Sequence, residues 1–325
     1  MFNRFHRQLL LSSCVFVIIA QGCGGGGSDN PSVESTVPDG LSDYIGTWVA
    51  SCTSAAPTFI YTLSISPDGQ YWVVEREYDA EANCGDDNSL ENVKITTALV
   101  SDIAANSDNN QYKDLYLNVS RTRKTPYSTT QVSEWISAEH CGRTDWSQGS
   151  EMTFDSNNSG NGCHQNTVRP AVLLDATTLS MNGRGGFDGL DPVDIVYTRQ
   201  SSNPRLTGKI AGKPWMAISG TAEELFTPGE LFFVIHETYI PDVCNSFASS
   251  VNHILFSFPA TTGSYTLSLS GDTVTLYDGD TNYIALDGSV DISTVTTDLV
   301  TGSMTATVDS DHTISGEFSA TRCSP

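Results

Sequence analysis

The sequence predicts an all-β protein in which two antiparallel β-barrel or β-sandwich domains follow an N-terminal leader and a flexible tether. Three observations predict this. Many short segments alternate apolar and polar residues, which is the period of a half-buried strand. Gly- and Asp-containing turns separate these segments at short intervals, as in sandwiches and barrels. The polar stretch Gln200–Pro204 divides the chain into two such regions.

The chain begins with a leader. A basic start at Arg4–Arg7 precedes the apolar run Leu9–Ala20. That run is too short to span a bilayer but suits the core of a signal peptide. The residues Ala20–Cys23 resemble the lipobox of bacterial lipoproteins. This resemblance implies a signal peptide over residues 1–22 and diacylation of Cys23, which becomes the new N-terminus.

Residues 23–40 are predicted to form a lipidated flexible tether. Gly24–Gly27 and the polar residues after them show no apolar period, and such a chain reaches about 23 Å as a random coil. Acyl chains contribute ~0.8 kcal/mol per buried CH₂ and so anchor a protein stably. By resemblance to lipoprotein sorting rules, Gly24 after the lipidated cysteine favours the outer membrane. We therefore expect a palmitate-carrying protein on the periplasmic or outer face of the bacterial envelope.

The first predicted domain covers residues 41–200. Tyr61–Ser66 alternates, Pro67–Gly69 turns the chain, and Gln70–Tyr78 returns as a second strand. This is a hairpin signal, because Asp-Gly readily adopts positive φ. Helical spacing predicts one short helix near Thr130–His140. Five further strands are predicted at Val93–Val100, Leu115–Val119, Val168–Asp175, Thr178–Asn182 and Val193–Arg199.

The second predicted domain covers residues 205–325, and its pattern is β throughout. Leu231–Ile235 and Ile254–Phe256 are continuous apolar runs, typical of strands covered on both faces. Other segments alternate between frequent turns, which predicts a sandwich or barrel. The alternating segments are Tyr265–Leu269, Val274–Leu276, Val290–Ile292, Met304–Val308 and Ile314–Ala320.

Six cysteines follow Cys23, and an even number in an exported chain indicates disulfides. Four precede residue 200 and two follow it, so each predicted domain has an even number. Pairing within domains, with the shorter loops preferred, predicts three bonds. These are Cys52–Cys84, Cys141–Cys163 and Cys244–Cys323.

Zinc is the alternative for the middle pair, because His140-Cys141 and Cys163-His164 together offer four suitable ligands. Adjacent residues on a strand point to opposite faces, however, which makes it hard for both members of a doublet to bind one ion. The oxidising compartment points the same way. We therefore favour the disulfide and predict no metal and no cofactor.

Residues Leu41–Val49 resemble the opening of a lipocalin-type (calycin) barrel, with a short helical turn followed by Gly-x-Trp on the first strand. In that family the tryptophan closes the barrel floor and a basic residue near the last strand lies across it. The resemblance covers about 160 residues and implies that Trp48 and Arg199 form this pair, a contact worth ~1–2 kcal/mol when desolvated. An eight-stranded barrel encloses just enough room for one small ligand, here expected to be apolar.

The formal net charge of −22 excludes a nucleic-acid binder that works by counterion release, and it argues against adhesion to anionic lipid through a polybasic patch. We find no Gly-x-Ser-x-Gly, His-Glu-x-x-His or Cys-x-x-Cys motif, so we name no catalytic residue and expect no enzyme.

Weaker candidates for chemistry are read as ordinary surface or core. They are the strand pair Glu75/Glu77, the histidines His236/His253, and acidic turns such as Asp278–Asn282. The leading hypothesis is a membrane-anchored envelope lipoprotein whose first barrel binds a small apolar ligand. The alternatives are an envelope adaptor that binds a protein partner, as yet unknown, and a hydrolase of an envelope polymer.

Overall fold

The computed structural model places Thr36–Pro325 in one compact unit. The residues described here lie in fifteen ranges and single positions. They are 37–50, 52, 58–79, 84, 89–107, 111–155, 163, 166–182, 194–201, 203, 205–225, 227–240, 243–245, 252–269 and 271–323. The predicted signal peptide and Cys23 lie outside them, as does most of the predicted tether.

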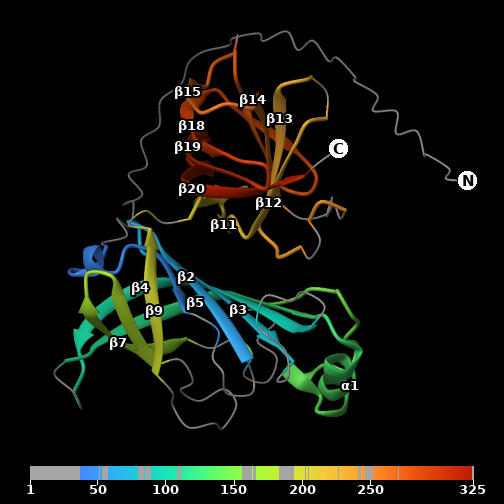
Figure 1. Ribbon diagram of the computed structural model, residues 1–325. Helices are drawn as coiled ribbons and strands as arrows, with labels where there is room; N and C mark the ends of the chain where they lie inside the picture. Colours follow the sequence, from blue (N-terminus) through green and yellow to red (C-terminus); the bar gives the residue numbers. More distant parts are fainter. Residues whose placement is uncertain are drawn as a thin grey trace, which may run out of the picture. The chain divides into compact units, whose positions relative to one another are not determined.

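The first sheet is an antiparallel barrel (Figure 1). Its strands follow one another in the order β4-β3-β2-β1-β9-β8-β7-β5, and β4 also pairs with β5, which closes a ring of eight. A ninth strand, β6, pairs with β5. The strands are β1 (Gly46–Ala50), β2 (Thr58–Ile65), β3 (Gln70–Tyr78), β4 (Leu90–Ala105), β5 (Lys113–Pro126), β6 (Met152–Asp155), β7 (Thr167–Asp175), β8 (Thr178–Asn182) and β9 (Asp194–Ser201). The architecture is consistent with a calycin-like barrel.

Two strands are longer than their apolar patterns predict. β4 has 16 residues and β5 has 14. Their pairing contains register shifts between Thr97 and Ala98 and between Val100 and Asp102. Bulges of this kind bend a strand and increase its twist. The same length lets β5 pair with β4 along its whole course and with β7 and β6 at separate parts of its other edge.

The predicted short helix is α1 (Thr129–Ser137). The Ser128 hydroxyl caps it by accepting a hydrogen bond from the backbone N–H of Gln131 at 3.0 Å, which satisfies one of the free amides of the first turn. After the helix, Glu139 and Cys141 both adopt positive φ, at 46° and 57°. Glu139 precedes the short 3₁₀ turn η3 (His140–Gly142), and Cys141 lies inside it.

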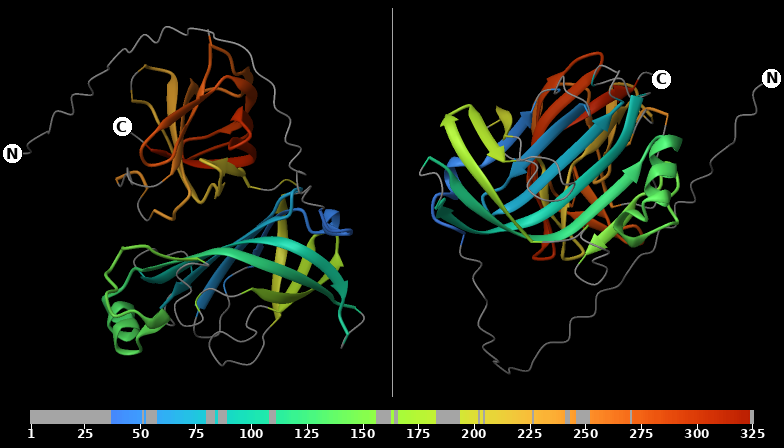
Figure 2. Two further views of the ribbon diagram at one scale, coloured as in Figure 1. Left: turned by 180° about the vertical axis from the view of Figure 1, so that it is seen from behind. Right: turned by 90° about the horizontal axis from the view of Figure 1, so that it is seen from below.

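The second sheet has 11 strands and curls into a half-barrel (Figure 2). Its main order is β15-β18-β19-β20-β12-β13-β14-β16-β17, with β10 paired to β11 and β20. The pairs are antiparallel except β12 with β20, which is parallel. The strands are β10 (Thr207–Ile210), β11 (Lys213–Met216), β12 (Ser219–Glu223), β13 (Glu230–His236), β14 (His253–Pro259), β15 (Gly263–Thr266), β16 (Val274–Tyr277), β17 (Asn282–Ala285), β18 (Asp287–Val295), β19 (Leu299–Asp309) and β20 (His312–Cys323).

The first two residues of the predicted linker Gln200–Pro204 belong to a strand. Gln200 and Ser201 belong to β9, and Ser201 pairs with Thr47 of β1. The reason is that the backbone of a strand pairs whether or not its side chains are apolar, so polar composition alone misplaced this boundary. The division into separate domains at this point stays a prediction.

All three predicted disulfides are present: Cys52–Cys84, Cys141–Cys163 and Cys244–Cys323. The last one joins the end of β20 to the segment that follows β13. It closes a sequence separation of 79 residues. In the chain-entropy account a bond of this span constrains the unfolded chain strongly.

His236 and His253 face each other on neighbouring strands. They are register partners in the pairing of β13 with β14, and their ring centroids lie 5.4 Å apart. His253 also lies against the ring of Tyr277, at 4.7 Å. Burial, with a smaller contribution from His253, lowers the pKa of His236 to about 4. The histidine therefore sits in the folded core as a neutral side chain.

A pH-dependent loss of stability follows. In the unfolded chain His236 has the ordinary pKa of 6.5. Between pH 6.5 and about 4, His236 therefore binds a proton in the unfolded chain but not in the folded one. The free energy of unfolding should fall across this window by about 2–3 kcal/mol and level off below it. Urea titrations of the wild type and of His236→Gln check this. The variant should lose that part of the slope, and parallel curves for the two proteins would contradict the assignment.

Candidate functional site

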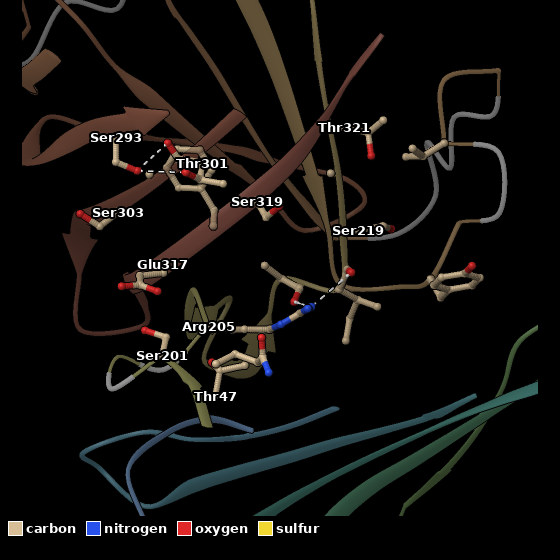
Figure 3. A pocket seen from close by; sticks show the side chains of 18 of the residues that line it. Thr47, Ser201, Arg205, Ser219, Ser293, Thr301, Ser303, Glu317, Ser319 and Thr321 are labelled. Atoms are coloured by element: carbon tan, nitrogen blue, oxygen red, sulfur yellow. Dashed lines mark hydrogen bonds between the residues drawn. The ribbon is translucent and has the colours of Figure 1, made fainter. Parts of the chain in front are cut away.

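The candidate site is a pocket of about 950 Å³ with a hydroxyl-rich wall (Figure 3). Strands β12, β18, β19 and β20 form much of the wall, and residues of β1 and β9 also line it. Eight of the lining residues are serine or threonine: Thr47, Ser201, Ser219, Ser293, Thr301, Ser303, Ser319 and Thr321.

Four of these hydroxyls lie on β19 and β20, where the alternation of side chains directs them to the pocket. In β19, Val300, Gly302 and Met304 are buried, and Thr301 and Ser303 lie between them on the other face. In β20 the same alternation buries Phe318 and Ala320 in the core. It leaves Glu317, Ser319 and Thr321 on the pocket side. The sheet thus packs an apolar core with one face and builds a polar wall with the other.

Arg205 supplies the positive charge of the pocket (Figure 3). Its backbone N–H donates to the Ser64 hydroxyl at 3.0 Å, and its Nη1 lies 3.5 Å from the carbonyl oxygens of Ala217 and Ile218. Burial, followed by the charge of Arg76, lowers its pKa to about 10, so it stays protonated at neutral pH. In the part of the chain that the structure describes, this half-buried guanidinium forms no ion pair.

Glu317 is the one carboxylate among the pocket residues that the structure describes. Its Oε1 accepts a hydrogen bond from Asn203 Nδ2 at 2.8 Å. Glycoside hydrolysis normally uses two carboxylates that flank the scissile bond. The described lining of the pocket therefore offers hydrogen-bonding groups and a single carboxylate.

Covalent and hydrogen bonds hold the pocket walls. Cys244 lines the pocket and is bonded to Cys323 at the end of β20. The Ser293 hydroxyl donates to the carbonyl of Thr301 at 3.1 Å and also lies 3.0 Å from the Thr301 hydroxyl. A wall fixed in this way loses less conformational entropy when a ligand binds.

Trp48 and Arg199, the pair that the lipocalin resemblance implies, are in contact. The guanidinium carbon of Arg199 lies 4.2 Å from the centre of the Trp48 ring. Trp48 Nε1 donates to the Tyr44 carbonyl at 2.9 Å, and Arg199 Nη2 donates to the Asp43 carbonyl at 2.7 Å. These bonds tie both side chains to the 3₁₀ turn η1 (Leu41–Asp43) and to Tyr44, which ends it. The two residues are thus held together, and their role in closing the barrel floor stays a prediction.

One cluster of buried side chains lies in the described interior of the barrel, and it includes Leu63, Ile65, Leu115 and Leu179. Tyr71 and Val73 of β3 belong to this cluster, while Trp72 and Val74 point to the opposite side. Alternation therefore directs Glu75 to the same face as Tyr71.

The Glu75/Glu77 pair is not the solvated strand face that the sequence suggested. Burial acts to raise the pKa of Glu75, but Lys94 Nζ, 2.8 Å away, together with more distant cations, outweighs it and lowers that pKa. Glu77 Oε2 accepts from Asn92 Nδ2 at 2.6 Å. Burial also raises the pKa of Tyr71 to about 12. The barrel therefore carries charged and phenolic groups on the inner face of β3, which sequence patterning did not identify.

The sequence analysis also did not predict a buried ionic cluster on β5. Arg123 is 2% exposed and lies 3.9 Å from Glu237 and 3.5 Å from Glu151. Arg121 reaches Glu237 at 3.4 Å. The available signal was the placement of Arg121 and Arg123 two residues apart on β5, which puts both on one face of the strand.

The Asp278 carboxylate accepts hydrogen bonds from within its own turn. Asp278 Oδ1 accepts from the N–H groups of Asp280 and Thr281, and Oδ2 accepts from the Tyr283 hydroxyl. These bonds, with the backbone bond to Thr281 first, lower the Asp278 pKa. The turn is therefore satisfied without a cation.

The chain was compared with known proteins. No family model matches it. No curated protein is similar to it in sequence. Among the described residues, none of the helices combines the length and apolar character needed to cross a bilayer.

Proposed function

We propose that this protein is a lipid-anchored component of the bacterial envelope that binds a small polyhydroxylated molecule, such as a short saccharide, in the pocket around Arg205. The observation that carries the proposal is the composition of the pocket wall, where eight hydroxyls surround one cation and one carboxylate. Each hydroxyl both donates and accepts, the guanidinium only donates, and the carboxylate only accepts. A saccharide offers the matching set of groups along its ring.

The size of the pocket supports the same class of ligand. About 950 Å³ lies at the upper end of ordinary ligand sites, which is enough for more than one sugar ring. Tyr239 and Ile240 add apolar surface to the lining, and the C–H faces of sugar rings suit such surface. Because a single carboxylate lines the described part of the pocket, we propose binding rather than hydrolysis.

The anchor and the family are part of the proposal. Support for the anchor comes from the leader and from Cys23, which lie in the sequence outside the described residues. Support for a lipocalin-like relationship comes from the eight-stranded barrel and the contact between Trp48 and Arg199. A small apolar ligand inside the barrel has less support, because the described interior is packed with side chains and includes the Glu75–Lys94 pair.

A saccharide screen tests the binding proposal. The mature protein is applied to an array of mono- to tetrasaccharides, and each hit is measured by isothermal titration calorimetry, with oleate as the apolar comparison. We expect saturable binding of at least one saccharide. Arg205→Gln should weaken it about 10- to 100-fold, because hydrogen bonds to a charged donor are worth about 1.5–3 kcal/mol.

A matched pair of variants localises the binding. Ser303 and Thr307 lie on the same face of β19, but only Ser303 lines the pocket. Ser303→Phe should abolish binding, whereas Thr307→Phe should leave it unchanged. Saccharide binding that survives both Arg205→Gln and Ser303→Phe would place the site elsewhere. An array without hits, together with stoichiometric binding of oleate, would favour the barrel interior instead.

A further inference from the structure

The Cys141–Cys163 disulfide lies beside an imidazole. Ligand atoms of His140, Cys141 and Cys163 all lie within 4.8 Å of one another. Thiolate sulfur and imidazole nitrogen are the preferred ligands of structural and catalytic zinc sites. Three such atoms from two distant segments are thus brought together, one pair by η3 and the third by the chain that follows β6.

Local backbone geometry explains how adjacent residues converge. The sequence-based argument against zinc placed His140 and Cys141 on a strand, where their side chains would diverge. They lie instead in η3, and Cys141 has a φ of 57°. A left-handed residue redirects the chain sharply, so the two side chains are not forced to opposite faces. That argument against a shared ion was therefore wrong.

The cluster is partly buried among aromatic side chains. Cys141 is buried in a small core with Trp135, Trp146 and Phe154, and Cys163 packs against it. The His140 ring stacks on Trp135 with centroids 4.7 Å apart. A low-dielectric setting of this kind strengthens a metal–thiolate interaction, because it excludes competing water.

His140 contributes a ring nitrogen to the cluster and lies beside a lysine. Its Nε2 lies 2.7 Å from Lys124 Nζ. A metal on this ring would therefore compete with Lys124 for Nε2 or bind through Nδ1. Zinc binds neutral imidazole and deprotonated cysteine.

We propose that reduction of the Cys141–Cys163 disulfide converts this cluster into a Zn²⁺ site. A dithiol reductant transfers two electrons and two protons to the disulfide, giving two cysteine thiols and the oxidised reductant. Zn²⁺ then displaces the two thiol protons and is held by two thiolates and His140. Water completes a tetrahedral set, the arrangement of zinc sites with three protein ligands. The cluster is thus a redox-gated metal site, independent of the saccharide pocket.

Metal titration tests this inference on the mature protein. One sample stays oxidised and one is reduced with tris(2-carboxyethyl)phosphine, and thiol labelling with mass spectrometry identifies the opened bonds. Zinc binding is measured by competition with a chromophoric chelator. Cobalt(II) is used in parallel, because thiolate-to-cobalt charge-transfer bands report sulfur ligands directly. We expect one Zn²⁺ per reduced chain and none at this site in the oxidised chain.

Variants separate this site from the other cysteines. Cys141→Ser/Cys163→Ser should remove the bound zinc and the charge-transfer bands, whereas Cys52→Ser/Cys84→Ser should keep both. His140→Ala, which retains both thiols, should weaken binding by about tenfold or more, and His312→Ala should not. The inference is overturned if the reduced wild type takes up no zinc, or if the Cys141→Ser/Cys163→Ser protein binds zinc and cobalt as the wild type does.

Discussion

Replacing Glu237 with glutamine should lower the free energy of unfolding by about 3–5 kcal/mol. Glu237 is 8% exposed and Arg123 2% exposed, so this cluster is largely removed from water. Glu237 provides a carboxylate to Arg123 and Arg121, and its backbone carbonyl accepts from Arg123 Nη2 at 2.7 Å. Removing one partner of a buried pair leaves the other charge uncompensated, and the cost is that of an unpaired buried ion.

Urea denaturation followed by circular dichroism measures the effect. Asp287→Asn is the matched control, because Asp287 is an exposed carboxylate of the second sheet and its loss should change stability by no more than about 0.5 kcal/mol. Glu151 is a quarter exposed and 3.5 Å from Arg123, so Glu151→Gln should fall between the two. If Glu237→Gln and Asp287→Asn prove equally stable, the cluster is not buried in solution.

Replacing Trp48 with alanine should also cost about 3–5 kcal/mol. The side chain is fully buried in the core of the barrel, and a Trp→Ala change in a core costs the lost transfer energy plus that of the cavity. The variant additionally loses the Nε1 bond to Tyr44 and the contact with Arg199. Because β1 joins β2 to β9, loss of its anchor weakens the closure of the ring.

Two variants give this prediction its controls. Trp48→Phe keeps an aromatic ring and should cost less than the alanine variant. Tyr116→Ala removes a ring from the exposed face of β5, where Tyr116 is 38% exposed, and should have a small effect. Urea midpoints and the near-ultraviolet circular dichroism of the three variants test the order. Equal destabilisation by Trp48→Ala and Tyr116→Ala would show that the floor is not a stabilising element.

Sequence patterning predicted the fold class and the helix, because alternation and helical spacing are local signals, and the preference for short loops within each domain predicted all three disulfides. It did not predict the length of β5, whose outward-facing Arg121 and Arg123 interrupt the apolar pattern while the backbone continues to pair. Both arginines bind Glu237, which lies 116 residues after Arg121 and 114 residues after Arg123 in the sequence. No local pattern records a partner at such a distance.

The candidate sites were unpredictable for a related reason. Serines and threonines of β19 and β20 look like an ordinary solvated face in sequence, and only the arrangement of several strands and Arg205 turns them into a pocket wall. At the Cys141–Cys163 bond the sequence supplied the right residues but the wrong local geometry. Two non-glycine residues with positive φ, Glu139 and Cys141, cannot be read from an alternation of apolar and polar letters.

The position of β20 decides when the second sheet can assemble. β20 is the last of the sheet's described strands in sequence, yet it lies in the interior of the sheet and pairs with β19, β12 and β10. During synthesis, β10, β12 and β19 emerge before β20 and keep unsatisfied backbone edges until β20 has been made. The second sheet therefore assembles late and exposes unpaired strand edges until then. A premature stop before His312 would leave a chain that is prone to aggregate rather than a shortened sheet.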